Sequence, residues 1–300
     1  FGLSASVIAS NFMPGGGSSD KLLNFFIVFS ISVAARPIGS IIFGRISDKI
    51  GRVVSVKITT IISALSVTVI AVLPSYEVVG FFATMILTLC RMVFVMSLAG
   101  EVDAIKVYIA EKIGKKSRHL ASSLVSFSAQ LGVLIAACMY HFTLSITEIS
   151  WLWRINFVVG GVFGLLVFFL RKSLHESSYY IKNKLKNEDK GGFSLVKILS
   201  QNRLKFLLAL LLSGGIGASY NFLIIFLGTF VADVLGTISR QDAAKSNIIL
   251  IIVYAVSCLI SGFLADRVSV YKQIFVSLAM IMCLVFTMQL FSLDNMYSFP

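Results

Sequence analysis

The sequence predicts an all-α polytopic membrane protein, built as a bundle of membrane-spanning helices. Hydrophobic residues make up 57% of the chain and charged residues only 13%, and the mean hydropathy of +0.91 is far above that of soluble domains. The apolar residues also fall in runs long enough to cross a hydrocarbon core of about 30 Å, which takes about 20 helical residues. Helices fit this environment because lipid offers no hydrogen-bond partners and a helix satisfies its own backbone groups.

Eight such runs follow one another along the chain. Each is continuous in hydrophobicity rather than alternating with a period of two, which excludes the strands of a membrane β-barrel. In chain order the predicted spans are 22–44, 53–73, 78–100, 119–142, 152–170, 206–231, 246–264 and 273–293.

The two ends of the chain predict a fragment, or a shortened product, of a larger protein. Residues 1–10, FGLSASVIAS, are expected to be the outer tail of a further helix whose beginning is absent. At the other end the chain stops at MYSFP, just after the last predicted span.

The basic residues predict the orientation of the bundle, since lysine and arginine are retained on the cytoplasmic side of short loops. Of the 26 such residues, 19 lie in alternate connections, 3 lie in the remaining connections and 4 lie within spans. The basic connections are 45–52, 101–118, 171–205 and 265–272. We expect these four to be cytoplasmic, in a multi-pass protein of a bacterial-type inner (plasma) membrane. The net charge of +12 then reflects the orientation of the chain in the membrane, and we expect no nucleic-acid partner.

Enzymatic activity finds no support in the sequence. The chain contains no nucleophile–base set, phosphate-binding loop or metal cluster of recognisable spacing. Its four cysteines all fall within apolar spans at no metal-like spacing, so we interpret them as packing residues and expect no metal site.

A short pattern occurs on both sides of the polar connection 171–205. The first copy reads Gly44-Arg-Ile-Ser-Asp48-Lys49 and the second reads Gly262-Phe-Leu-Ala-Asp266-Arg267, each between two spans. Such a parallel repeat is typical of transporters, whose substrate site lies near the midplane between the halves. We therefore divide the chain into an N-terminal helical half (1–170, first helix truncated), a cytoplasmic central loop (171–205) and a partial C-terminal half of three helices (206–300).

The repeated connections are candidates for a conformational latch. A connection this short forces two antiparallel helices together, glycine allows their close approach, and an Asp beside a helix N-terminus meets the positive end of its dipole. Basic residues could bridge to the other half in one conformation and release it in another. The alternative is that these connections only join neighbouring helices and fix the topology. The candidate latch residues are Gly44, Asp48, Lys49, Gly51, Arg52, Gly262, Asp266 and Arg267.

The segment Gly44-Arg-Ile-Ser-Asp48-Lys49-Ile-Gly51-Arg52 resembles the cytoplasmic signature loop of the major facilitator superfamily. Further segments narrow the resemblance to the metabolite:proton symporter branch, and most closely to its proline/glycine betaine (osmoprotectant) transporters. They are ARPIGS (35–40), LPSYE (73–77), LCRM (89–92), AGE (99–101), YIAE (108–111), WLWRINF (151–157) and LRKSLHES (170–177). The resemblance implies a helical bundle of two six-helix halves, here incomplete at both ends, with no cofactor beyond the proton gradient.

The chain departs from the family pattern at several positions. Val53 stands where a basic residue is expected after Arg52, and Phe94-Val95 stands where the fourth helix usually has Gln-Gly. Asn156 replaces an expected proline. Since the family has twelve helices, this chain lacks most of the first and the last three.

Ionisable groups inside membrane helices are costly and are therefore functional candidates. Arg91 lies mid-span with no carboxylate at i±4, and by resemblance it matches a basic residue linked to proton coupling. Its alternative role is structural, as the partner of a carboxylate on another helix. Arg36 could pair with Glu101 or extend to the membrane surface. Glu101 and Asp103 are two residues apart, so they point to different faces of one helix and at most one should face the centre.

The segment SGGIGASYNF (213–222) is a second candidate region. Its three glycines permit a bend in the helix, and Tyr220 and Asn221 follow near mid-membrane. An aromatic wall there could hold a quaternary ammonium by cation–π attraction, although simple packing also explains such residues.

The topology and the repeat predict a membrane transporter, and the resemblance implies proton-coupled import of a small metabolite by alternating access. The resemblance favours a proline- or betaine-type osmolyte or a related organic acid, with the lipid bilayer, the substrate and protons as partners. Proton binding would neutralise a carboxylate and lower the free energy of the conformation that buries it. The alternative is a truncated membrane protein that no longer transports, as a decayed gene product or a sensor.

Overall fold

The computed structural model describes residues 1–113, 117–146, 151–177, 180–181, 202–269, 271–277 and 279–280. Over these residues the chain is helical and contains no strand. Seven helical stretches are long and apolar enough to cross a membrane: Ser18–Lys49, Arg52–Val72, Phe81–Ile113, Arg118–Ser145, Trp153–Arg171, Arg203–Val234 and Arg240–Ala265. They match the first seven predicted spans in order, which confirms the all-α polytopic class. Most of the eighth predicted span, 273–293, lies outside the described residues.

The described helices follow one another in chain order. They are η1 (Gly2–Ser4), α1 (Ala5–Phe12), α2 (Ser18–Ala34), α3 (Arg36–Lys49), α4 (Arg52–Val72), α5 (Tyr76–Val79), α6 (Phe81–Ile113), α7 (Arg118–Ser145), α8 (Trp153–Arg171), α11 (Arg203–Tyr220), η2 (Asn221–Phe226), α12 (Leu227–Thr229), η3 (Phe230–Val234) and α13 (Arg240–Ala265). Here η1 is a 3₁₀ turn, whereas η2 and η3 are π-helical.

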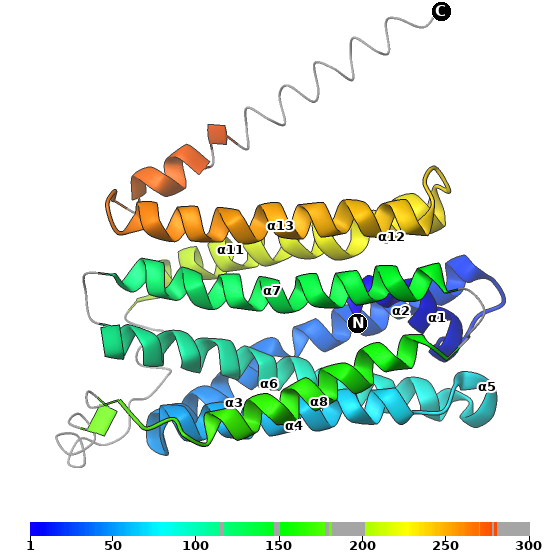
Figure 1. Ribbon diagram of the computed structural model, residues 1–300, viewed down its shortest axis with the longest axis horizontal. Coiled ribbons are helices and arrows are strands. Elements are labelled where there is room, and N and C mark those ends of the chain that lie inside the picture. Colours follow the sequence, from blue (N-terminus) through cyan, green and yellow to red (C-terminus); the bar gives the residue numbers. More distant parts are fainter. Residues whose placement is uncertain are drawn as a thin grey trace, which may run out of the picture.

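The long helices lie side by side, with α7 between two groups (Figure 1). One group consists of α3, α4, α6 and α8, in which α4 packs on both α6 and α8, and α3 packs on α6. The other consists of α11, α12 and α13, and α7 packs along α13. The α3–α4 connection, the end of α6, the start of α7 and the end of α13 lie at one end of the bundle, at the left of Figure 1. We call this the basic end, because described parts of the basic connections identified in the sequence lie there.

The first span is broken where the sequence carries a proline. Helix α2 ends at Ala34 and α3 begins at Arg36, with Pro37 in its first turn. Proline has no N–H and therefore interrupts the hydrogen-bond ladder at this point. Between them the Ala35 N–H donates to the Ser32 carbonyl at 3.2 Å, a tighter 3₁₀-type bond.

The connection predicted at 45–52 is shorter than expected. Helix α3 continues to Lys49 and α4 begins at Arg52, so only Ile50 and Gly51 lie outside a helix. The extra helical turn keeps the backbone hydrogen-bonded while Arg45, Asp48 and Lys49 extend from its surface.

The N-terminal tail is packed into an aromatic core at the end of the bundle opposite the basic end. Phe12 of α1 is fully buried, and its ring meets that of Trp153 edge-on at 5.5 Å between centroids. The Thr84 hydroxyl of α6 donates to the Phe12 carbonyl at 2.5 Å. These contacts fix α1 against α6 and α8.

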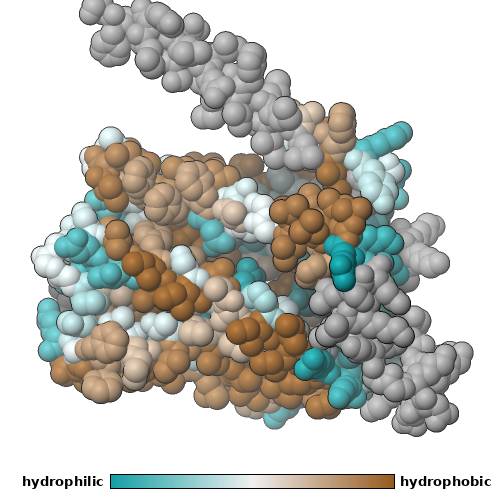
Figure 2. All heavy atoms as spheres, turned by 180° about the vertical axis from the view of Figure 1, so that it is seen from behind, coloured by the Kyte–Doolittle hydropathy of each residue, from teal (hydrophilic) through white to brown (hydrophobic). Residues whose placement is uncertain are grey.

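Large apolar side chains cover much of the outer surface, as the brown areas of Figure 2 show. On α11 no residue is buried, and side chains such as Leu207, Leu211 and Ile216 are at least half exposed. An apolar exterior of this kind is what a lipid environment requires.

Candidate functional site

Arg91 lies on α6 inside a cage of three aromatic rings. Its guanidinium carbon is 4.4 Å from the ring centroid of Phe1, 5.1 Å from that of Phe29 and 5.6 Å from that of Phe94. Its Nε is enclosed, and no hydrogen bond or ion pair reaches the side chain from the described part of the chain. The ring faces stabilise the cation without neutralising it. The guanidinium therefore remains available to an anion.

Arg36 adds a second positive charge. It is the first residue of α3, it is exposed, and within the described ranges it makes no hydrogen bond or ion pair. Its charge is close enough to act unfavourably on that of Arg91. The pairing of Arg36 with Glu101 that the sequence suggested is not formed.

Glu101 instead pairs with Arg171. The Arg171 Nη1 donates to Glu101 Oε1 at 2.7 Å, and it also donates to the hydroxyl of the buried Thr60. The pair joins α6 to the last residue of α8, with less than a fifth of each side chain exposed. Because both side chains are mostly buried, loss of either charge would leave the other buried without a partner, which is unfavourable.

Asp103 points away from this pair, as its spacing from Glu101 predicted. It is exposed and accepts a hydrogen bond of 3.4 Å from the Ser40 hydroxyl of α3. The two acids thus contact different helices.

Tyr220 and Asn221 lie where α11 gives way to the π-helical η2. The Tyr220 hydroxyl donates to Gln130 Oε1 of α7 at 3.3 Å, and its ring meets that of Tyr254 of α13 at 5.4 Å. Asn221 donates to the Gly217 carbonyl of its own helix at 2.7 Å. Tyr220 therefore joins α11 to α7 and α13, whereas Asn221 stabilises its own helix locally.

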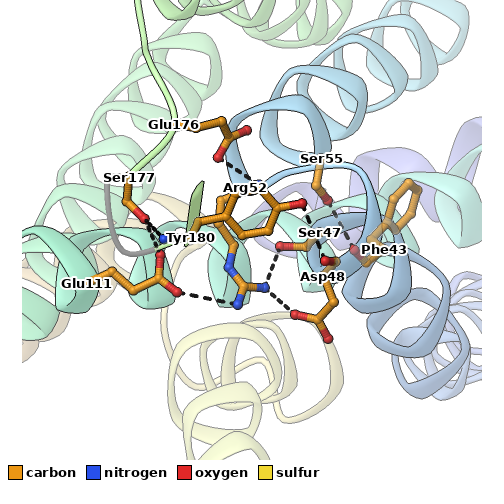
Figure 3. A network of polar contacts seen from close by, with 9 residues as sticks. All are labelled: Phe43, Ser47, Asp48, Arg52, Ser55, Glu111, Glu176, Ser177 and Tyr180. Carbon is orange, nitrogen blue, oxygen red and sulfur yellow. Dashed lines mark hydrogen bonds and ion pairs between the residues drawn. The ribbon is translucent and has the colours of Figure 1, made fainter. Parts of the chain in front are cut away.

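At the basic end, Arg52 is the centre of a polar network (Figure 3). Its guanidinium forms an ion pair with Asp48 one turn earlier, donates to the Ser47 hydroxyl at 3.2 Å and lies 3.4 Å from Glu111 of α6. The same guanidinium lies 5.7 Å from the ring centroid of Tyr180. Arg52 thereby connects the end of α3, the start of α4 and the end of α6.

Glu176, which follows α8, covers the start of α4 (Figure 3). The Arg52 and Val53 backbone N–H groups donate to its carboxylate at 3.1 and 2.9 Å. A side chain at Gly51 would overlap this carboxylate, and Gly51 has a φ of +150° that only glycine adopts easily. Glu176 thus binds the backbone N–H groups at the helix start beside which the sequence placed Asp48, whereas Asp48 itself pairs with the Arg52 side chain.

Ser177 and Tyr180 also connect the residues that follow α8 to α6 and α3. The Ser177 hydroxyl donates to Glu111 at 2.6 Å, and the Tyr180 hydroxyl donates to the Asp48 carbonyl at 3.4 Å. Burial, together with the negative charge of Glu176, raises the pKa of the Tyr180 hydroxyl. The hydroxyl therefore keeps its proton and remains a hydrogen-bond donor.

The second copy of the pattern makes a contact between the end of α13 and the start of α7. The Asp266 carboxylate accepts hydrogen bonds of 3.0 Å from the backbone N–H groups of His119 and Leu120, at the start of α7. A side chain on Gly262 would overlap that of Ser123, so this glycine permits the close approach of α13 and α7.

The remaining latch candidates make fewer contacts. Arg267 stacks on the ring of Phe263 at 4.1 Å, a side chain at Gly44 would meet open space, and Lys49 has no ion pair within the described ranges. The two copies are therefore not equivalent. The described contacts of the first join elements of residues 1–181, and those of the second connect α13 to α7.

Several residues of these networks were not predicted. They are Glu111, Arg171, Glu176, Ser177 and Tyr180. Four of them belong to the quoted segments YIAE and LRKSLHES. The signal that could have identified Glu111 and Glu176 is the presence of acids in otherwise basic connections.

Comparison with known proteins agrees with this architecture. Residues 2–299 match the family profile described as Major Facilitator Superfamily. The chain is 29% identical to a "Putative proline/betaine transporter" of Staphylococcus haemolyticus, covering 99% of this chain and 63% of that protein. It is 27% identical to a "Citrate-proton symporter" of Salmonella typhi, covering 89% of this chain and 62% of that protein. The chain thus spans about three fifths of these relatives.

A solved structure shows the same fold. The xylose transporter XylE from E. coli, in a partially occluded inward open conformation, superposes with a TM-score of 0.62 at 17% identity. The superposition covers 89% of this chain and 68% of that one.

Proposed function

The chain belongs to the Major Facilitator Superfamily, a family of membrane transporters, and from this premise we propose that it serves in proton-coupled import of a small carboxylate-bearing metabolite. The substrate is a proline- or betaine-type osmolyte or a related organic acid, moved by alternating access. The relatives named above are a proline/betaine transporter and a citrate-proton symporter. Proline, betaine and citrate all carry a carboxylate.

The observation that carries this proposal is the uncompensated guanidinium of Arg91. A charge within a membrane helix is costly unless it is paired, and no partner of Arg91 is found in the described part of the chain. A substrate carboxylate at Arg91 would supply the missing charge. The nearby charge of Arg36 further favours an anionic group at this position.

Proton coupling is proposed to act through Glu101. Its ion pair with Arg171 joins α6 to α8, and protonation of the carboxylate would remove the attraction that maintains the pair. A conformation without this pair would then be more populated, so proton binding and helix movement would be coupled. The bonds from α7 to Asp266 would act as the latch between α7 and α13, at the cytoplasmic side.

Uptake by proteoliposomes tests this proposal. Labelled proline, glycine betaine and citrate are supplied with and without an inwardly directed proton gradient, to this chain and to its full-length reading frame. We expect gradient-dependent uptake of one of them, reduced at least tenfold by Arg91→Ala and unchanged by Arg118→Ala, which removes an exposed arginine. Uptake by the longer protein alone would identify this chain as a non-transporting portion of a symporter. If neither protein takes up any of the three despite correct insertion, the proposed substrate class is wrong.

A further inference from the structure

The three rings around Arg91 come from different parts of the chain and are themselves held in place. Phe1 precedes η1, Phe29 belongs to α2, and Phe94 follows Arg91 by three residues on α6. Phe25 supports two of them, since its fully buried ring stacks on that of Phe1 at 5.3 Å and lies 6.1 Å from that of Phe29. Phe29 is itself only 7% exposed. The rings around the guanidinium are therefore fixed by their own packing.

These rings are the contacts that hold the Arg91 side chain. No hydrogen bond or ion pair reaches it from the described residues, and an arginine side chain left free has many rotamers. A guanidinium within about 6 Å of a ring centroid is attracted to the ring, and more strongly where water is excluded. Three such contacts favour one orientation of the side chain before any ligand arrives.

The rings also leave the hydrogen-bond donors of Arg91 free. A carboxylate or an amide placed beside the guanidinium would occupy its N–H groups, whereas a ring interacts through its face and accepts no conventional hydrogen bond. Within the guanidinium only Nε is fully enclosed, and Arg91 as a residue is partly exposed. Its two Nη groups are therefore open to an anion, and together they match the two oxygens of a carboxylate.

We propose that Phe29 and Phe94 are positioning residues, which orient Arg91 so that its Nη groups meet the substrate carboxylate. This role rests on the proposed function, in which Arg91 binds that carboxylate. The rings reduce the ordering cost of binding because the side chain is already held in place. Charge alone is not sufficient for this arrangement. Arg91→Lys, which keeps the charge but lacks the planar fork, should weaken binding at least tenfold.

Fluorinated phenylalanines separate this electrostatic role from simple packing. Fluorine withdraws electron density from the ring face with little change in volume, so the attraction for a cation falls stepwise with each fluorine. Binding of labelled proline, glycine betaine and citrate is measured on this chain and on its full-length reading frame. For the probe that binds, 3,4,5-trifluorophenylalanine at position 29 or 94 should raise Kd about tenfold, with 4-fluorophenylalanine between the two.

Phe26 is the matched control for the fluorinated series. It lies on α2 three residues before Phe29, and its ring contacts those of Phe25 and Phe226 rather than Arg91. The same fluorinated residues at position 26 should leave Kd unchanged. An equal effect at positions 26 and 29 would show that packing is responsible, and this would overturn the positioning role.

A second readout needs neither ligand nor transport. In the NMR spectrum of the ligand-free chain with labelled arginine, the Arg91 side-chain signals should lie upfield, because protons over a ring face are shielded. Phe29→Leu and Phe94→Leu should each move them back, and unshifted signals in the wild type would overturn the proposal. Binding that requires Arg91 but is insensitive to fluorination would overturn the positioning role alone. Binding that survives Arg91→Ala would overturn the proposed function as well.

Discussion

Gly51 shows how one residue determines the shape of the basic end. Its φ of +150° allows the chain to reverse between α3 and α4 with only two residues outside a helix. The absence of a side chain also lets the Glu176 carboxylate reach the first N–H groups of α4. The backbone conformation of the turn and the space for the Glu176 carboxylate thus both require glycine at position 51.

The substitution Gly51→Ala should therefore be destabilising. Its methyl group would displace Glu176 and hold the backbone in a disfavoured region, at a free energy of about 2 kcal/mol. We expect the apparent unfolding temperature of the detergent-solubilised protein to fall by several degrees. Gly44→Ala is the matched control, because its methyl group meets open space on α3 and alanine favours helix. Equal destabilisation by both substitutions would show that the conformation of Gly51 is not the cause.

At the scale of helices, two carboxylates bind helix N-termini from distant parts of the chain. Glu176 lies more than 120 residues after the α4 N–H groups that it binds, and Asp266 lies nearly 150 residues after those of α7. Each carboxylate satisfies N–H groups that lack an intrahelical partner and interacts favourably with the helix dipole. The start of each helix is thus coupled to a remote segment.

Removing either carboxylate should loosen one helix start and leave the other intact. Asp266→Ala is expected to increase hydrogen–deuterium exchange at the His119 and Leu120 amides about tenfold, because about 1.4 kcal/mol of protection is lost. Glu176→Ala should have the same effect at Arg52 and Val53. Each variant serves as the control for the other. An increase at both helix starts in either variant would indicate general unfolding instead.

The sequence predicted the spans because hydrophobic run length is a local property, and all seven described spans follow it. It identified Asp266 as a candidate through the repeat, but not its partner, since the start of α7 is brought to it only by folding. The pairing of Glu101 with Arg171 was missed for the same reason. Arg171 was counted as a basic residue of the connection 171–205, and a charge count does not identify which opposite charge lies nearby.

The whole molecule has two chemically different ends. At one end Arg52, Glu111, Asp48 and Glu176 form the polar network of the basic connections (Figure 3). At the other end Phe12, Phe25 and Trp153 pack the N-terminal tail against α6 and α8. Of these four residues only Arg52 belongs to the basic residues that predict a cytoplasmic location for this end, since the positive-inside rule gives acidic residues little weight. Arg52 would therefore contribute both to the orientation in the membrane and to the polar network.

This asymmetry predicts which end an impermeant reagent can reach. In a chain whose native cysteines are replaced by alanine, Lys49→Cys introduces a thiol at the exposed end of α3 and Glu77→Cys introduces one in α5, at the opposite end. In intact spheroplasts a charged maleimide should label the cysteine at position 77 and spare that at position 49. Both should be labelled after permeabilisation, which controls for their reactivity. The reverse pattern would place the basic end outside, and the latch proposed at Asp266 would then close the extracellular side.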